Sequence, residues 1–182
     1  QLSRLGKKVI IFDADMGLAN VEVMFGAIPK YNLSDVLYKG MAMRDVITNG
    51  PMDIGFVSGG SGVVGLNNLT REQILSVVGK LSELDFLADI ILIDTGAGIS
   101  DNVMEFVIAS PEVLLITTPD PSSLTDSYSL IKTLDRSRQF NYTDTVINVI
   151  ANKVNTEADG QAVYDKLNSV VSQFLNCNVN YL

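Results

Sequence analysis

Short runs of consecutive apolar residues recur along the chain, and each run ends in polar residues. The first run, Val9–Phe12, is followed by Asp13, Ala14 and Asp15. Runs of this length that contain β-branched residues are typical of strands buried on both faces, as in a parallel sheet. Three later runs follow the same pattern: residues 90–93 precede Asp94, residues 113–116 precede Thr117 to Asp120, and residues 146–151 precede Asn152.

The segments between these runs have helical periodicity. The clearest is Thr70–Leu84, in which Thr70 and Gln73 form a capping box and apolar residues recur every three or four positions. Other helices are expected from Ser100 to about Ser110, from a box of Ser123 and Asp126 to about Arg138, and over Glu157–Leu175, with shorter helices at 20–26, 33–37 and 43–47 and short strands at 53–57 and 179–182. Alternating strands and helices predict one doubly wound α/β domain with a mostly parallel sheet over residues 1–182.

The ends of these strands are where a ligand site is expected. Right-handed crossovers bring the carboxyl ends of parallel strands to one edge of a sheet, and open α/β sheets bind ligands there. Strands beginning near Lys8, Ile54, Ile90, Val113 and Val146 are therefore expected in a single sheet. The residues expected at its carboxyl edge are Asp13, Asp15, Asp94, Pro119 and Asn152.

Composition removes several classes of function. The 182 residues contain one cysteine and no histidine, which excludes a disulfide framework, a Cys/His zinc site and Ser-His or Cys-His catalysis within this chain. A single thiol fits a reducing cytoplasm. The net charge of −8 opposes binding to free nucleic acid or an anionic membrane, since no dense basic cluster offsets it.

An aspartate at the end of an apolar strand is suited to magnesium chemistry. Mg²⁺ takes few carboxylates and completes its shell with waters and substrate phosphates. Asp94, followed by Gly96 and Gly98, fits a Walker-B aspartate before a mobile switch loop, and Asp15 is placed to orient an attacking water. A helix cap or loop acid remains an alternative for Asp94. The phosphate loop G-x-x-x-x-G-K-[ST] does not occur in the chain.

A glycine-rich segment, residues 58–65, offers a different interpretation. Gly60, Gly62 and Gly65 spell G-x-G-x-x-G after a probable strand, as in dinucleotide-binding folds. However, residues 66–69 separate it from the next helix, and no acidic residue ends a strand about 20 residues later. The segment is expected to be mainly a flexible loop, and a dinucleotide-dependent oxidoreductase remains an alternative function.

Four blocks of the sequence resemble the MinD/ParA class of deviant Walker P-loop ATPases, and especially its FlhG (FleN, YlxH) regulators of flagellar number. The blocks are DADMGLANVEVMFG from Asp13, GGSG at 59–62, DTGAGIS from Asp94 and TTPDPSSLTDSYSLIK from Thr117. They occur in the family's order and span nearly the whole chain. Asp120 and Glu22 depart from the residues that many family members have there.

The resemblance implies a three-layer α/β fold, ATP and Mg²⁺ as cofactors, and an ATP-bound homodimer. It assigns catalysis to Asp15, metal binding to Asp15 and Asp94, and nucleotide binding to Asp13, Gly98, Pro119 and Asn152. It also implies protein partners in the flagellar or division machinery, no direct nucleic acid partner, and a cytoplasmic protein with peripheral association at the inner face of the cell membrane.

The same resemblance implies that the chain is an internal fragment, truncated at both ends. The family's phosphate loop is expected before residue 1 and its membrane-targeting helix after Leu182. The complete protein is expected to be an ATPase, whereas these 182 residues alone are expected to bind ATP weakly and not hydrolyse it. A non-catalytic adaptor with the same fold remains an alternative.

Overall fold

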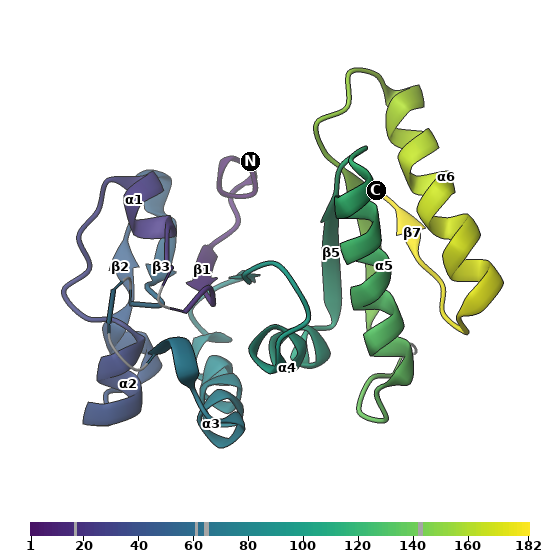
Figure 1. The fold of residues 1–182 in the computed structure, drawn as a ribbon. Helices are drawn as coiled ribbons and strands as arrows, with labels where there is room; N and C mark the ends of the chain where they lie inside the picture. The colour runs from purple at the N-terminus through teal and green to yellow at the C-terminus, as the bar shows by residue number, and fades with distance from the viewer. Residues whose placement is uncertain (17, 61, 64–65, 142–143) are drawn as a thin grey trace. The chain divides into compact units, whose positions relative to one another are not determined.

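Residues 1–16, 18–60, 62–63, 66–141 and 144–182 are described by a computed structural model (Figure 1). The chain divides into two units, each of which is described by itself. Unit 1 comprises residues 1–97 and 101–106, and unit 2 comprises residues 98–100 and 107–182. The prediction of one domain over residues 1–182 remains a prediction.

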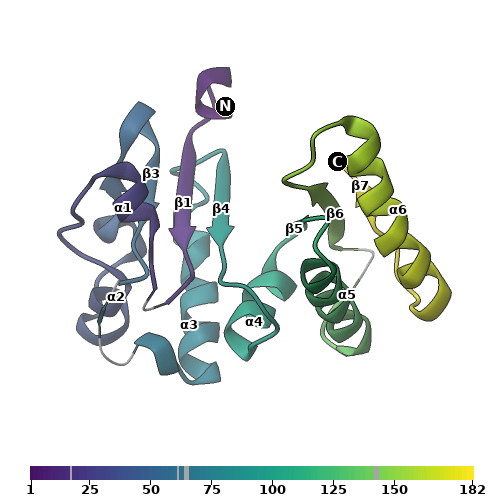
Figure 2. The same cartoon turned by 45° about the horizontal axis from the view of Figure 1, so that its top comes forward.

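Unit 1 is built around strand β1 (Val9–Asp13). This strand pairs in parallel with β3 (Gly55–Val57) on one side and with β4 (Ile90–Asp94) on the other, and β2 (Thr48–Asn49) joins β3 antiparallel (Figure 2). The central position explains why β1 is apolar, because both of its faces are covered. The parallel pairing predicted from the apolar runs is confirmed for these strands.

Helices and short 3₁₀ turns enclose the core of unit 1. Phe12 and Phe106 are almost fully buried and their ring centroids lie 5.6 Å apart. Each large side chain buried in this way contributes about 1.5–3 kcal/mol to folding. The surrounding elements are α1 (Val21–Phe25), α2 (Leu33–Lys39), α3 (Arg71–Leu81), α4 (Asp101–Ala109, which enters unit 2 after Phe106), η1 (Ser3–Leu5), η2 (Met43–Val46), η3 (Pro51–Asp53), η4 (Leu66–Asn68) and η5 (Ser82–Leu84).

Local sequence signals set most helix ends. The capping box of Thr70 and Gln73 is present at the start of α3, as predicted. The predicted box of Ser123 and Asp126 is wrong: α5 (Pro121–Arg136) begins three residues earlier, because its N-cap is Asp120, and Pro121 lies in its first turn. Proline suits that position because its missing N–H would have had no partner within the helix.

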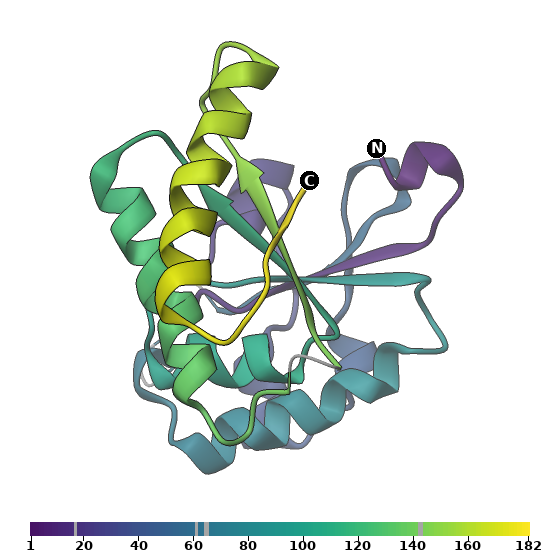
Figure 3. The ribbon, with the colours of Figure 1, turned by 90° about the vertical axis from the view of Figure 1, so that its right-hand side faces the viewer.

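Unit 2 is a second parallel α/β layer. Its sheet has the order β5 (Glu112–Thr117), β6 (Val146–Ala151), β7 (Asn180–Tyr181), and α5 and α6 (Glu157–Phe174) pack against each other and against the strands (Figure 3). Among the described residues no helix is long and apolar enough to cross a membrane.

The described strands form one sheet in each unit, and the prediction of a single sheet remains a prediction. Within the described residues, β4 bonds only to β1 and β5 only to β6. An apolar run predicts a buried strand, but it does not specify which strand lies beside it.

Candidate nucleotide and metal site

Asp13 and Asp94 end neighbouring parallel strands at the same level. They are partners in the register of β1 and β4, and the N–H of Ala14 donates to the carbonyl oxygen of Asp94 at 2.7 Å. The expectation that these aspartates share one sheet edge is therefore confirmed. Two independent apolar strands deliver carboxylates to one place because parallel strands end together.

The carboxylate of Asp13 is buried and bonded to the protein's own backbone. It accepts the N–H groups of Asp15 at 3.2 Å, Asn20 at 2.9 Å and Val21 at 3.1 Å. Asp13 thus closes the loop after β1 and satisfies N–H groups at the start of α1. Burial raises the pKa of Asp13, the three N–H donors oppose that rise, and the charge of Asp94 adds to it. A direct contact of Asp13 with nucleotide remains a prediction.

Asp15 lies next to the loop that follows Asp94. A Cβ atom on Gly96 would be 3.0 Å from Oδ1 of Asp15, so the glycine allows this approach. The pKa of Asp94 is raised, first by partial loss of hydration and second by the negative charge of Asp15. The negative charges of Asp15 and Asp94 therefore repel each other, and a bound cation would relieve that repulsion.

Two carboxylates match the small protein ligand set that Mg²⁺ uses. The described residues contain no cluster of three or more Asp, Glu, His or Cys side chains that forms a complete metal cage. Mg²⁺ usually binds one or two carboxylates and takes its remaining ligands from water and substrate phosphates. Asp15 and Asp94 fit that type of site.

The described start of the glycine-rich segment, residues 58–60, is packed at this edge and is not the flexible loop that was predicted. Residues 58–60 are buried; the hydroxyl of Ser58 donates to the carboxylate of Glu22 and accepts the N–H of Gly60 at 3.1 Å. A Cβ on Gly59 would lie 2.5 Å from the carbonyl oxygen of Asp13, so only glycine fits there. Gly65, the third glycine of the G-x-G-x-x-G pattern, lies outside the described residues.

Ser58 and Glu22 were not predicted as part of the site. They connect α1 with the end of β3, so they hold in place the two segments that flank Asp13. The only sequence signal was the position of Ser58 directly after a strand, and nothing in the sequence linked it with Glu22.

Gly98, Pro119 and Asn152 belong to unit 2. Pro119 and Asn152 follow the carboxyl ends of β5 and β6, as predicted, and the N–H of Asn152 donates to the carbonyl of Thr117 at 2.7 Å. The side-chain oxygen of Asn152 accepts the N–H of Lys153 at 2.8 Å, and its exposed amide nitrogen has no partner among the described residues. That N–H₂ group is free to donate to a base. Gly98 has a φ of +104°, which favours glycine.

Ser123, predicted to cap a helix, instead organises the loop after β5. Its hydroxyl accepts the N–H of Thr118 at 3.0 Å and lies 3.2 Å from the hydroxyl of the buried Thr117. These bonds fix the backbone on either side of Pro119. The local box pattern predicted that Ser123 caps a helix, because such a pattern cannot reveal the contact of Ser123 with the end of β5.

The chain is similar to bacterial regulators of flagella. It is 36% identical over 181 residues to the antiactivator FleN of Pseudomonas aeruginosa, covering 100% of this chain and 63% of FleN. It is 33% identical over 186 residues to the flagellum site-determining protein YlxH of Helicobacter pylori, covering 100% of this chain and 60% of YlxH. The chain thus spans less than two thirds of either relative. No family model matches it.

A solved structure supports the fold independently. The septum site-determining protein MinD of Pyrococcus horikoshii, complexed with Mg-ADP, matches 98% of this chain and 69% of its own length with a TM-score of 0.73 and 22% sequence identity. At that identity the likeness shows the fold alone. The predicted P-loop NTPase-like α/β fold class is confirmed.

Proposed function

Since the chain belongs with the MinD/ParA-type P-loop ATPases and has FlhG-group proteins among its relatives, we propose that its complete gene product binds and hydrolyses ATP. Turnover of ATP to ADP and phosphate would control the number or placement of flagella or of the division apparatus. The observation that carries the proposal is the convergence of Asp15 and Asp94 at one sheet edge, with Gly96 between their loops.

The role proposed for each aspartate follows from its surroundings. Asp94, exposed at the strand end, would hold Mg²⁺ directly or through its waters, and Asp15 would orient the water that attacks the γ-phosphate. Bound Mg²⁺ supplies positive charge that neutralises the phosphates and the two carboxylates. Asp13 keeps the β1 loop in shape through its three N–H bonds, and its predicted contact with nucleotide would add to this structural role.

The remaining nucleotide contacts are assigned to unit 2. Gly98 presents backbone N–H groups to the γ-phosphate, and its positive φ keeps the loop in a conformation that residues with a Cβ rarely adopt. Asn152 donates its exposed side-chain N–H₂ group to adenine, and Pro119 borders the same base. The support for these roles is their position at strand ends and the fixed backbone around Pro119.

Regulation requires more than hydrolysis. We assign to the complete gene product an ATP-dependent homodimer, protein partners in the flagellar or division machinery, and peripheral association with the inner face of the cell membrane from the cytoplasm. The relatives' names support the partner assignment: FleN is named an antiactivator and YlxH a flagellum site-determining protein. The homodimer, the membrane association and the cytoplasmic location rest on the resemblance of the sequence blocks to the family. The net charge of −8 is the reason to expect no direct nucleic acid partner.

A dinucleotide-dependent oxidoreductase is the less favoured alternative. Its pattern needs the glycine loop to present free N–H groups to a pyrophosphate. The N–H of Gly60 is already bonded to Ser58, and Gly59 is in contact with Asp13. The loop is therefore committed to the packing of the sheet edge.

Phosphate release by the complete gene product, with Mg²⁺ and ATP, tests the proposal. Asp94→Asn should reduce turnover at least tenfold, because it removes the charge that holds the metal. Asp85→Asn, an exposed aspartate in the turn before β4, is the matched control and should retain wild-type turnover. Nucleotide binding without any turnover would favour the non-catalytic adaptor, and stabilisation by NAD instead of ATP would favour the oxidoreductase.

A further inference from the structure

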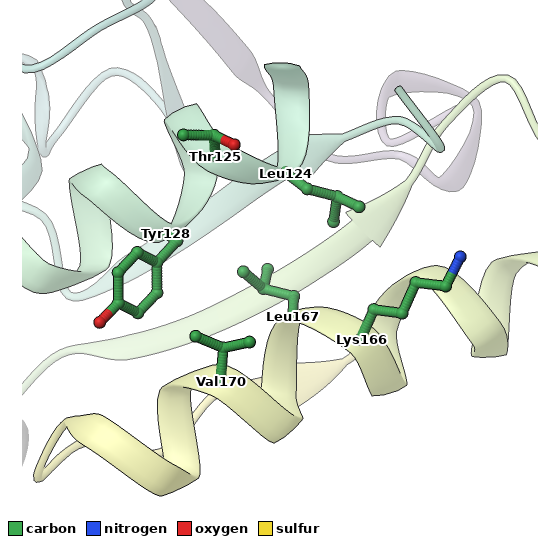
Figure 4. Close-up of a pocket in the computed structure, with 6 residues that line it drawn as sticks. All are labelled: Leu124, Thr125, Tyr128, Lys166, Leu167 and Val170. Carbon is green, nitrogen blue, oxygen red and sulfur yellow. The ribbon is translucent and has the colours of Figure 1, made fainter. Parts of the chain in front are cut away.

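A groove between α5 and α6 in unit 2 has no part in the nucleotide site. It encloses about 260 Å³ and is lined by Leu124, Thr125, Tyr128, Lys166, Leu167 and Val170. In Figure 4 the aliphatic side chains point into the space between the two helices, with Tyr128 and the ammonium group of Lys166 at opposite ends. The groove is therefore an apolar trough along a helix pair.

Helical spacing extends this apolar surface. Lys166, Val170 and Phe174 are four residues apart on α6, so they follow one another along one face of the helix. Val170 is 39% exposed and Phe174 is 64% exposed, whereas Leu167 below them is 3% exposed. Exposed apolar residues that form a continuous stripe over a buried floor indicate a contact surface more strongly than scattered ones do.

A lysine stands at each end of the groove. Lys166 stands at one end, and at the other Nζ of Lys132 lies 5.9 Å from the ring centroid of Tyr128. Neither lysine forms an ion pair with any described residue. On a chain of 13 basic and 21 acidic residues, two lysines that lack acidic partners and bracket an apolar trough form a local site of opposite charge.

The size and charge of the groove select one kind of occupant. Its volume is below the roughly 300–1,000 Å³ that is usual for small-molecule sites, but it accommodates a few protruding side chains. Leu124 and Lys132 are eight residues apart on α5, which corresponds to about 12 Å along a helix. An anionic bilayer is a poorer match, because two lysines do not outweigh the net charge of −8.

We propose that this groove docks an amphipathic α-helix of a partner protein, with two turns of apolar side chains seated on Leu167 and Val170 and acidic residues at both ends facing Lys132 and Lys166. Helix-in-groove recognition of this kind uses apolar anchors spaced three or four residues apart. The flanking charges fix the register of the helix and select its partner. None of the residues that line the groove is assigned to the nucleotide site, so peptide binding and ATP turnover can be measured separately.

Two labelled helical peptides of about 16 residues test the proposal on the complete gene product by fluorescence anisotropy. Both carry two leucines four residues apart; one has glutamates at each end of the stripe and the other has lysines. The glutamate peptide should bind in the micromolar range and the lysine peptide at least tenfold more weakly. Equal binding of the two peptides, or no binding at millimolar concentration, would overturn the proposal.

Variants locate the binding. Val170→Asp should weaken binding of the glutamate peptide at least tenfold. Ser169→Asp, which adds the same charge at the neighbouring exposed position, should leave that binding unchanged. Lys132→Glu/Lys166→Glu should reverse the preference and bind the lysine peptide. Equal losses in both aspartate variants would show that the effect is not specific to the groove.

Two further measurements separate this proposal from others. ATP turnover without peptide should be the same in wild type and groove variants, so a failure of the ATPase proposal leaves the docking result interpretable. Phosphatidylglycerol vesicles that capture wild type but not Lys132→Glu/Lys166→Glu would overturn the helix assignment in favour of a membrane. Self-association that is lost in Val170→Asp would overturn it in favour of a second copy of the chain.

Discussion

Oδ1 of Asp15 lies 3.0 Å from the point where a side chain would begin on Gly96. The loop after β1 and the loop after β4 therefore approach each other as closely as the absence of a Cβ allows. This relationship connects the residue assigned to water positioning with the loop assigned to sensing the γ-phosphate. It also explains why glycine occupies position 96 although its φ does not require one.

Gly96→Ala should impair ATP turnover more than folding. The added methyl group would displace the carboxylate of Asp15, which is the end of a short side chain that can rotate away. We expect turnover to fall by about tenfold, less than the roughly 10²-fold that a 1 Å misplacement can cost, because the carboxylate has to move by only a few tenths of an ångström. Phosphate release by the complete gene product measures the loss, and thermal unfolding should change little.

Gly79→Ala is the matched glycine substitution and should affect folding stability more than ATP turnover. Gly79 lies in α3, and no atom lies within 4 Å of the position that its Cβ would occupy. Alanine should stabilise the protein by about 0.5–1 kcal/mol, since it reduces the conformational entropy lost on folding. Urea unfolding measures this, and a destabilised variant would show that α3 is packed more tightly there than the structure indicates.

Asp13→Asn should destabilise unit 1 by about 1–3 kcal/mol. The carboxylate accepts three N–H groups through both of its oxygens, whereas asparagine has one acceptor and would turn an N–H₂ group toward a backbone donor. Equilibrium urea unfolding at neutral pH provides the measurement. An unchanged free energy of unfolding would mean that the backbone bonds of Asp13 are dispensable.

Asp94→Asn should instead make the metal-free protein slightly more stable at pH 7. Because the folded-state pKa of Asp94 is raised above 3.8, its charged form is disfavoured in the folded protein. The stability linked to its protonation is fully present below pH 3.8 and is lost as pH rises through the folded pKa. The expected gain is below about 1 kcal/mol, since the group remains partly hydrated.

The pH dependence provides the check on this prediction. Wild type and Asp94→Asn should differ in free energy of unfolding at pH 7 and converge as pH falls below 4, where the aspartate is protonated in both the folded and the unfolded state. Added Mg²⁺ should stabilise wild type but not the variant. A variant that is less stable than wild type at pH 7 would mean that the Asp94 carboxylate supports the fold.

Sequence patterns predicted the strands and their polar ends because short apolar runs rich in β-branched residues favour strands. Burial on both faces explains the run in β1, whereas β5 alternates buried and exposed residues. The pairing of Asp13 with Asp94 followed from two such runs, and the box at Thr70 followed from four adjacent residues. Each of these features depends on short-range chemistry. They were the parts of the fold that reading the residues in order could supply.

Features that depend on contacts between distant segments were not predictable in this way. Three hydrogen bonds join groups that no local pattern relates. They are the bond from the backbone N–H of Val21 to Asp13, the bond between Ser58 and Glu22, and the bond from the N–H of Thr118 to Ser123. A polar residue at a strand end can serve the ligand or the loop, and only its surroundings distinguish the two.

The role proposed for Asp15 is to position the attacking water at a site that Asp94 and Mg²⁺ would complete. ATP turnover and ATP-dependent dimerisation of the complete gene product, in wild type and Asp15→Ala, test this role. Turnover should fall by about 10²–10⁴-fold, while dimerisation by ATP remains measurable because the phosphate contacts are intact. Unchanged turnover in Asp15→Ala would show that Asp15 does not position the water.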